Sequence, residues 1–221
     1  MRIHPSVPYR VDETPASVVS RLALLHRAES VRVFSLDMGM PFQAIVDGDP
    51  VALADLADLV GIPVKPLADA AIVRTSDAFS LREQQLAKPM LRRARTVICP
   101  RCLAEDLRDA PQPWMASGRV QWQLDPIRTC HLHGVALTEI AVVNSPSLMN
   151  DLARLAAPSV GNIQRMADDI DEIAPSSMET YLLERLNGVV GPAWLDALGR
   201  RSVAYGRCNG IVDHNRSPVS A

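Results

Sequence analysis

The strongest constraint on how this chain folds is a pair of closely spaced ligand-type residues at each end of residues 99–133. Cys99 and Cys102 form the first pair, and Cys130 and His133 form the second. Two residues separate the members of each pair, and twenty-seven residues lie between the pairs. Three thiolates and one imidazole are a donor set that a closed, tetrahedral structural zinc site uses. The spacing therefore predicts one structural Zn²⁺ held by these four residues, with a small zinc ribbon between the pairs.

Two other interpretations of these residues stay open. Close cysteines also occur as buried apolar thiols or as disulfide partners. His131 competes with His133 as the fourth ligand, but it directly follows Cys130, so its ring is expected to point away from the ion and His133 is preferred. Glu105 and Asp106 are interpreted as surface or hydrogen-bonding groups, because four donors already close the tetrahedron.

Composition favours helices and limits the kinds of partner. Of the 221 residues, 48% are hydrophobic but only 4% are aromatic, so we expect an aliphatic, mainly helical core. The formal net charge is −2, so a nucleic-acid contact would need a local basic patch. The sequence has no apolar run of membrane-spanning length and no signal-peptide pattern, and its cysteines are spaced for metal. These features predict a cytoplasmic protein without a membrane partner.

The first helix is predicted from its start signal. Thr14 followed by Pro15 is typical of an N-cap with proline in the first turn. Apolar residues at helical spacing extend the prediction over residues 15–28. Arg21 and Arg27 flank the apolar stripe and are expected to be solvated.

A second start signal predicts a pair of helices further along. Asp49 followed by Pro50 predicts a helix over 50–60, which Gly61 ends. A shorter helix is expected over 64–72. A helix, a short turn containing glycine and a second helix form the outline of a helix-turn-helix, so residues 1–95 are predicted to be a helical, helix-turn-helix-like region.

A local excess of positive charge precedes the first cysteine pair. Between residues 74 and 101 the bases are Arg74, Arg82, Lys88, Arg92, Arg93, Arg95 and Arg101, and the acids are Asp77 and Glu83. A basic cluster beside a zinc ribbon suits phosphate contacts, which position a protein without reading sequence. The candidate nucleic-acid-binding or partner-binding residues are Lys88, Arg92, Arg93, Arg95 and Arg101. A solvated face and a surface for an acidic protein remain alternatives.

Short elements are also predicted around and within the ribbon. Residues 80–83 match a capping box and predict the start of a short helix. Residues 96–98 and 120–124 are predicted strands, the first of which leads into the metal site. Trp114 and Trp122 are expected to supply the core of the ribbon, with stacking on a nucleobase as the lesser interpretation.

The chain returns to helices after the second ligand pair. The predicted helices span residues 147–155, 163–170, 176–188 and 192–198. The chain is thus predicted to consist of an N-terminal helical region (residues 1–95), a zinc-ribbon module (residues 96–140), a C-terminal helical region (residues 141–208) and a flexible tail (residues 209–221).

Several runs of this sequence resemble one known family. Cys99-Pro100-Arg101-Cys102-Leu103-Ala104-Glu105-Asp106 resembles the zinc-knuckle signature of TniQ (TniQ/TnsD-like) transposition proteins. Trp122, followed by Cys130 and then His133-Gly134 and Leu137, looks like the second half of that signature. Weaker similarity to the family's first helix and to its C-terminal helices lies in residues 14–23, 182–186 and 194–195. The resemblance covers roughly residues 9–200.

The resemblance implies a fold and a role. The fold would be mainly α, with a helix-turn-helix region, a zinc ribbon and further helices. The role would be that of an accessory or targeting factor that recruits an AAA+ regulator and a transposase to target DNA. Some members associate with an RNA-guided CRISPR complex, often as a dimer. The zinc ligands carried over are Cys99, Cys102, Cys130 and His133, while position 131, often Pro in the family, is His here.

Other function classes lack their motifs. The chain has no H-x-E with P-C-x-x-C of zinc deaminases, no H-E-x-x-H of zinc proteases and no glycine-rich nucleotide loop. A closed ligand set leaves no coordination position for a substrate. The sequence therefore predicts a non-enzymatic protein, and the alternative to a transposition factor is a stand-alone zinc-ribbon and helix-turn-helix DNA-binding regulator.

Overall fold

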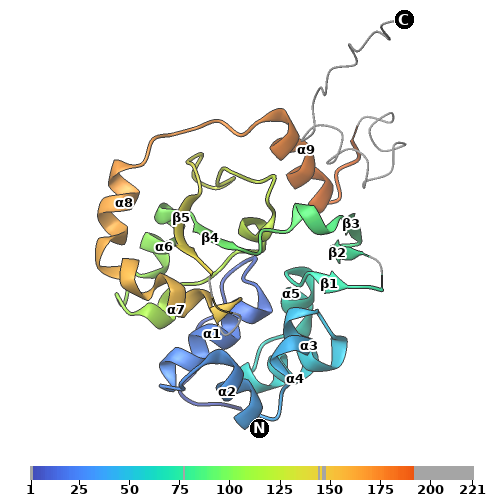
Figure 1. Cartoon of the computed structure of the whole chain (residues 1–221), viewed down its shortest axis with the longest axis vertical. Helices are drawn as coiled ribbons and strands as arrows, with labels where there is room; N and C mark the ends of the chain where they lie inside the picture. Colours follow the sequence, from blue (N-terminus) through green and yellow to red (C-terminus); the bar gives the residue numbers. More distant parts are fainter. Residues whose placement is uncertain (1, 77, 144, 146–147, 192–221) are drawn as a thin grey trace, which may run out of the picture.

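Helices dominate the structure, and short strands form two small sheets. The computed structural model describes residues 2–76, 78–143, 145 and 148–191 (Figure 1). Helix accounts for 46% of the described residues, which confirms the predicted mainly helical fold. The predicted helix over 192–198 and the predicted tail over 209–221 lie outside the described residues. Within the described ranges, no helix combines the length and hydrophobicity that crossing a membrane requires.

Two of the five described N-terminal helices, Pro15–Leu25 (α1) and Pro50–Val60 (α4), begin where the capping signals predicted. The other three are Val31–Asp37 (α2), Phe42–Val46 (α3) and Val64–Asp69 (α5). The Thr14 side chain accepts a hydrogen bond from the Ser17 amide, and the Asp49 side chain accepts from the amides of Val51 and Ala52. Gly61 ends α4 in the left-handed region, with φ of +76°, which glycine adopts without steric cost. Helices α1 and α5 each end three residues earlier than predicted.

Helices α2 and α3 were not predicted from the sequence. Both are shorter than two and a half turns, too short to show a clear apolar stripe. They nevertheless bury Val31, Phe34, Phe42 and Ile45 against α1. Together with α1, α4 and α5 they enclose the first hydrophobic core.

A three-stranded antiparallel sheet replaces the short helix predicted from residues 80–83. Its strands are Val73–Arg74 (β1), Phe79–Leu81 (β2) and Gln84–Leu86 (β3), in the order β1-β2-β3. Arg82 and Glu83 form the two-residue turn, with φ of 48° and 64°, as a type I′ hairpin requires. The hairpin places Phe79 opposite Leu86 and buries Leu81 and Leu86 in one core, whereas a helix would separate these leucines by more than a quarter turn.

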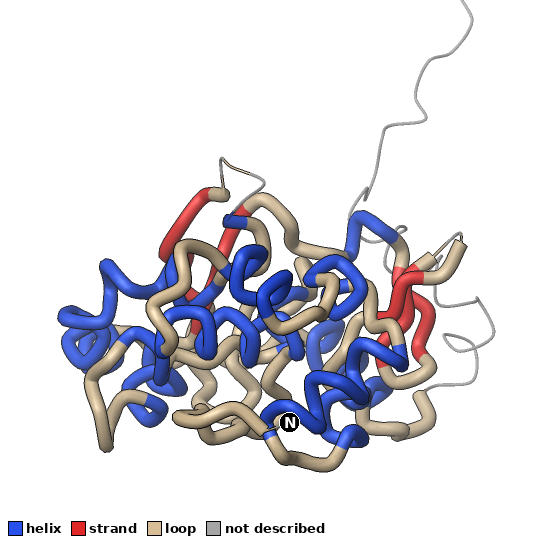
Figure 2. The backbone as a smooth tube through the Cα atoms, turned by 90° about the horizontal axis from the view of Figure 1, so that it is seen from below, coloured by secondary structure: helices blue, strands red, loops and turns tan. Residues whose placement is uncertain are grey.

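The second sheet flanks the cysteine pairs. Strand Arg95–Ile98 (β4) pairs antiparallel with Thr138–Val142 (β5), with a register shift between Thr96 and Val97. The predicted strand over 96–98 is therefore present. Helix Pro100–Asp106 (α6) follows β4 directly. In Figure 2 the two sheets lie on different sides of the molecule.

The strand predicted over 120–124 is wrong. Val120–Gln123 is a 3-10 helix (η3), and only Leu124 makes an isolated bridge, to Leu91. Val120, Gln121 and Trp122 are buried in succession, which a strand with one buried face does not allow. Trp122 belongs to the core around the cysteines, as predicted. Trp114 instead packs against the N-terminal core, so of these two tryptophans only Trp122 serves the predicted ribbon core.

The C-terminal helices wrap the metal region. The described ones are Leu152–Ala156 (α7), Ile163–Asp169 (α8) and Ser177–Leu186 (α9), with a 3-10 helix Ala157–Asn162 (η5) between the first two. The helix predicted from Ser147 begins at Leu152, while Ser147 itself lies outside the described residues. The predicted capping box at the start of α9 is present, between Ser176 and Glu179. Helix α8 packs against α6, and α9 lies near the β2–β3 hairpin (Figure 1).

Candidate metal centre

The first cysteine pair lies at the start of α6. Strand β4 ends at Ile98, so Cys99 becomes the N-cap of α6 and Pro100 occupies its first turn. The Cys99 sulfur accepts a hydrogen bond from the Cys102 amide, with 3.5 Å between sulfur and nitrogen. Because both residues lie on one helical turn, their sulfur atoms face the same side.

The second pair is formed by a tight turn. The Cys130 amide donates to the Val135 carbonyl at 2.8 Å, and the Gly134 amide donates to the Cys130 carbonyl at 2.8 Å. Gly134 has a φ of +59°, which a residue with a Cβ rarely adopts. This turn brings the His133 ring back over the Cys130 sulfur.

The four side chains converge with the spacing of a tetrahedral metal site. The ligand atoms of Cys99, Cys102, Cys130 and His133 all lie within 4.8 Å of one another. The Cys102 and Cys130 sulfurs are 3.6 Å apart, and His133 Nδ1 lies 3.3–3.6 Å from the three sulfurs. A zinc ion with ordinary Zn–S and Zn–N bonds sets ligand separations of roughly 3.5–3.8 Å in a tetrahedron. The residues present therefore fit a zinc ion.

The electrostatics of the three thiols also favour a cation. The pKa of Cys102 lies above its ordinary value because its side chain hydrogen-bonds to Cys130 and Cys99, and burial adds to the shift. The pKa of Cys130 lies below its ordinary value because Cys102 and Cys99 donate to its sulfur. Three thiolates at this separation need a positive ion between them.

The burial of the cluster distinguishes the two histidines. Cys99, Cys102 and Cys130 are buried, and His133 is partly buried. His131 is exposed and is not part of the cluster. The other ring nitrogen of His133, Nε2, lies 3.2 Å from Glu105 Oε1. A carboxylate on the outer nitrogen fixes the tautomer that leaves Nδ1 as the ligand.

Arg92, one of the candidate nucleic-acid or partner residues, is turned into the protein. Its guanidinium donates to the carbonyls of Trp122 at 2.7 Å, Asp125 at 3.1 Å and Ile127 at 2.9 Å. Burial lowers its pKa below the ordinary value. Arg92 therefore orders the segment that leads to Cys130.

Two further candidates form ion pairs at the surface. Arg95 lies 3.5 Å from Asp125 and 3.8 Å from Glu139. Arg101 lies 3.2 Å from Glu172. These half-exposed pairs are of a kind that contributes little to stability, so their cations remain able to exchange partners.

Lys88 and Arg93 occupy a different setting. Both line a cleft beside the β1–β3 sheet, and the Arg93 guanidinium lies over the Phe79 ring at 4.9 Å from its centroid. The structure thus separates the five predicted basic residues. The Arg92 guanidinium is turned inward, Arg95 and Arg101 form surface ion pairs, and Lys88 and Arg93 line the cleft.

A buried polar network on α1 was missed by the sequence reasoning. Arg21 is fully buried and pairs with Glu13 at 2.8 Å, so the expectation that Arg21 is solvated is wrong. Ser17 donates to Glu13 and accepts from the Gly118 amide, and Arg21 donates to the Trp114 carbonyl. Residues 13, 17 and 21 are spaced four apart, so they share one face of α1 and its cap. That spacing was the signal available in the sequence.

Asp106 is a second buried polar group near the metal centre. It pairs with Arg119 at 2.9 Å and with Arg10 at 3.4 Å, and it also accepts from Ser117. Its interpretation as a hydrogen-bonding group agrees with these contacts, and they tie the end of α6 to the N-terminal segment.

Comparison with known proteins supports the sequence resemblance. A family model described as TniQ matches residues 4–137. The matched span includes α1 to α6 and all four residues of the cysteine–histidine cluster. No curated protein matches the chain.

Proposed function

The chain belongs to the TniQ family, a family of non-catalytic, transposition-associated proteins, and from this we propose that it is an accessory or targeting factor in DNA transposition. In this role it bridges target DNA, or an RNA-guided CRISPR complex, to the transposon's AAA+ regulator and transposase. The observation that carries the proposal is the family match, which spans the N-terminal helices and the metal cluster.

The proposed cofactor is one structural Zn²⁺ held by Cys99, Cys102, Cys130 and His133. The distances among the donor atoms support it. When bound, the ion supplies a fixed crosslink between the start of α6 and the turn after Thr129. Four protein donors leave no position for a substrate, which favours a scaffold over a catalyst.

The division of the chain into regions is part of the same proposal. We assign residues 1–95 to a helix-turn-helix-like region, 96–140 to a zinc-ribbon module, 141–208 to a helical region and 209–221 to a tail. The α4–α5 pair joined at Gly61, and the β4–β5 sheet beside the metal cluster, support the first two assignments.

Co-purification tests the bridging role. A tagged chain is co-expressed with the AAA+ regulator and the transposase, with and without a target-DNA fragment, and the retained proteins and nucleic acids are identified. We expect the regulator to be retained by the wild-type chain and lost with Cys102→Ser, while His131→Ala serves as the matched control that keeps the four ligands. If the wild-type chain retains the regulator neither with nor without target DNA, the bridging role is contradicted.

The second candidate function is a stand-alone DNA-binding regulator. The α4–α5 pair favours it, although Lys65 on α5 is already paired with Asp69 at 2.8 Å. A regulator binds a specific duplex without other proteins, and its affinity falls steeply with salt. Sequence-specific duplex binding by the purified chain, together with no retention of the transposon proteins, would favour this alternative.

A further inference from the structure

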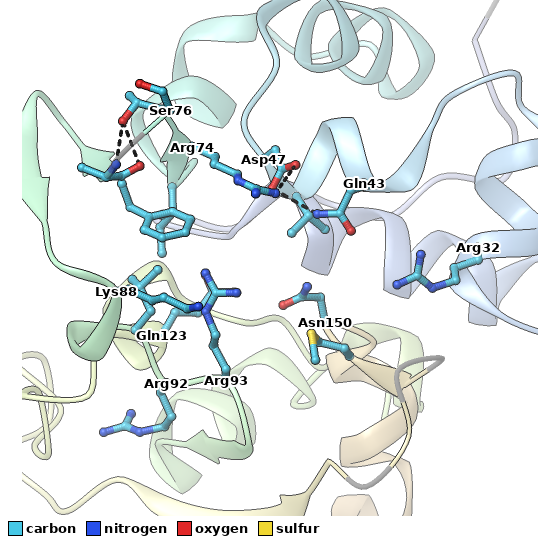
Figure 3. A pocket seen from close by; sticks show the side chains of 17 residues that line it. Arg32, Gln43, Asp47, Arg74, Ser76, Lys88, Arg92, Arg93, Gln123 and Asn150 are labelled. Carbon is cyan, nitrogen blue, oxygen red and sulfur yellow. Dashed lines mark hydrogen bonds and ion pairs between the residues drawn. The ribbon is translucent and has the colours of Figure 1, made fainter.

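A polar cleft lies where the N-terminal helices, the three-stranded sheet and the metal region meet. Its volume is about 330 Å³. Figure 3 shows Arg32 and Gln43 entering from α2 and α3, Arg74 from β1, and Lys88 and Arg93 from the chain that leads to β4. Asn150, which precedes α7, faces them from another side.

Positive charge predominates in this cleft. Among the described residues that line it, the cationic side chains are Arg32, Arg74, Lys88, Arg92 and Arg93, and the only carboxylate is Asp47. Asp47 is paired with Arg74 at 3.6 Å, and the Arg92 guanidinium points away from the cleft in Figure 3 toward the backbone carbonyls that it contacts. Lys88 and Arg93 therefore contribute positive charge without a carboxylate partner within the described stretches of the chain.

The cleft also holds groups that are already oriented. The Arg93 guanidinium rests against the Phe79 ring, which restricts its rotation and leaves its edge N–H groups for an anion. Gln123 and Asn150 add side-chain amides to the lining. These groups come from separate walls of an open cleft, so they suit an extended anion better than a single compact one.

We propose that this basic cleft binds the phosphodiester backbone of a nucleic-acid strand, with Lys88 and Arg93 as the principal phosphate contacts. The inference deepens the proposed function, on which it rests, by naming how the chain contacts nucleic acid. Arginine matches phosphate oxygens with its planar fork, and amides reach sugar and phosphate oxygens. Arg93 covers one face of the Phe79 ring, so that face is not available to stack on a base.

Nucleic acid suits this lining better than an acidic protein segment does. Charged and amide side chains make up nine of the seventeen described residues that line the cleft, and apolar side chains make up six. The lining therefore offers more partners for phosphate and sugar oxygens than apolar pockets for peptide side chains. An acidic peptide is nevertheless included in the test as the competing ligand.

The test compares two double variants that each remove two positive charges. Lys88→Gln with Arg93→Gln alters the cleft, and Arg108→Gln with Arg165→Gln, at exposed positions outside it, is the matched control. Binding of labelled single-stranded DNA, RNA of the same sequence and the duplex is measured by fluorescence anisotropy at a series of salt concentrations. A polyglutamate peptide is the acidic-protein arm.

We expect the cleft variant to lose about tenfold or more in nucleic-acid affinity and to flatten the dependence of log K on log salt by about one to two units, because two phosphate contacts are lost. The control variant should bind like the wild type, and both should melt at the wild-type temperature. Equal affinity and equal salt slope for the two variants would overturn the proposal, as would binding of polyglutamate in preference to every nucleic acid. Retention of the AAA+ regulator is measured separately. A result that overturns nucleic-acid binding by the cleft therefore does not by itself overturn the bridging role.

Discussion

Among single residues, the Glu13–Arg21 pair shows how much polar chemistry this fold buries. Both side chains are fully buried, and Arg21 also donates to the Pro8 carbonyl at 2.9 Å and the Trp114 carbonyl at 2.8 Å. A buried charge is costly unless it is paired and hydrogen-bonded. Among the described residues, Nε and Nη1 of Arg21 have partners, whereas the buried Nη2 has none. The pair thus fixes the segment around Trp114 to α1.

Removing one member of this pair should be costly. Glu13→Ala leaves the Arg21 charge buried with only carbonyl partners, and we expect a loss of about 3–5 kcal/mol in the free energy of unfolding, measured by urea denaturation. Asp69→Ala breaks the exposed Lys65–Asp69 pair and is the control, with an expected loss below about 1 kcal/mol. Similar losses of unfolding free energy for the two variants would mean that other groups stabilise the buried Arg21 charge when Glu13 is absent.

The ligand set makes a second prediction at single residues. Cys102 is almost fully buried among the other donors, so Cys102→Ser should abolish stoichiometric zinc binding and lower the melting temperature, because metal-binding free energy is folding free energy here. Zinc is measured by elemental analysis of the purified protein. His133→Ala should behave like Cys102→Ser, whereas His131→Ala should retain one zinc. Full zinc content in Cys102→Ser would remove the proposed ligand set.

Among the elements, α9 is attached both by its apolar side chains in the third hydrophobic cluster and by the carboxylate of Glu179. Glu179 accepts hydrogen bonds from the amides of Arg128 at 2.7 Å, Thr129 at 2.8 Å and Ser176 at 2.9 Å, and from the Thr129 hydroxyl. Burial alone would raise the pKa of Glu179, but these hydrogen bonds outweigh it and hold the pKa below its ordinary value of 4.5. The helix is thereby fastened to the residues just before Cys130.

This attachment predicts a pH-dependent stability difference. Since the folded pKa of Glu179 is lowered, its contribution is fully present above its unfolded pKa and is lost as the pH falls through the folded value. Glu179→Gln should therefore cost about 2 kcal/mol at pH 7, and this gap from the wild type should shrink below about pH 4.5. Urea denaturation at several pH values measures it. Acid release of metal affects both proteins, so the difference between them isolates Glu179, and a gap independent of pH would contradict this account.

The sequence predicted the elements whose signals are local. Helices α1, α4 and α9 begin at the predicted caps, because Thr14, Asp49 and Ser176 act on amides two or three residues away. Residues 80–83 also carry a local cap pattern, yet burial of Leu81 and Leu86 on one face selects a hairpin. Long-range packing therefore overrode the local signal there.

The residues of the candidate site also divide into those that local sequence patterns predict and those that distant contacts position. The convergence of Cys99, Cys102, Cys130 and His133 follows from two short spacings, so the sequence could predict it. The positions of Arg21 and Arg92 depend on carbonyls 93 and 30 residues away in the chain, and no local pattern reports those contacts. The same limit applies to the basic cleft, whose walls come from separate segments of the chain.

Across the whole molecule, two of the three hydrophobic clusters take their buried residues from more than one of the proposed regions. One cluster contains residues from α1 to α5, and a second surrounds the cysteines. The third joins Ala70 and Leu81 to Val120, Ile127 and Leu186, so the N-terminal region, the zinc-ribbon module and the C-terminal region all share it. Ser20 on α1 also donates to Asp151 at 2.5 Å and accepts from the Ala153 amide. The described regions are therefore expected to fold as one cooperative unit.

Metal removal tests that cooperativity. In calorimetry the zinc-loaded protein should unfold in one transition, and a chelator should move the whole transition to lower temperature, because the loss of order at the cysteines weakens the cluster shared with the N-terminal helices. Re-addition of Zn²⁺ should restore the original transition, whereas Mg²⁺, which prefers oxygen ligands, should not. Two transitions, of which one is insensitive to chelator, would show instead that residues 1–95 fold independently. Proteolysis should then release the N-terminal helices intact, so the calorimetric result also decides whether the proposed boundary at residue 95 marks a domain or only a change in the kind of structure.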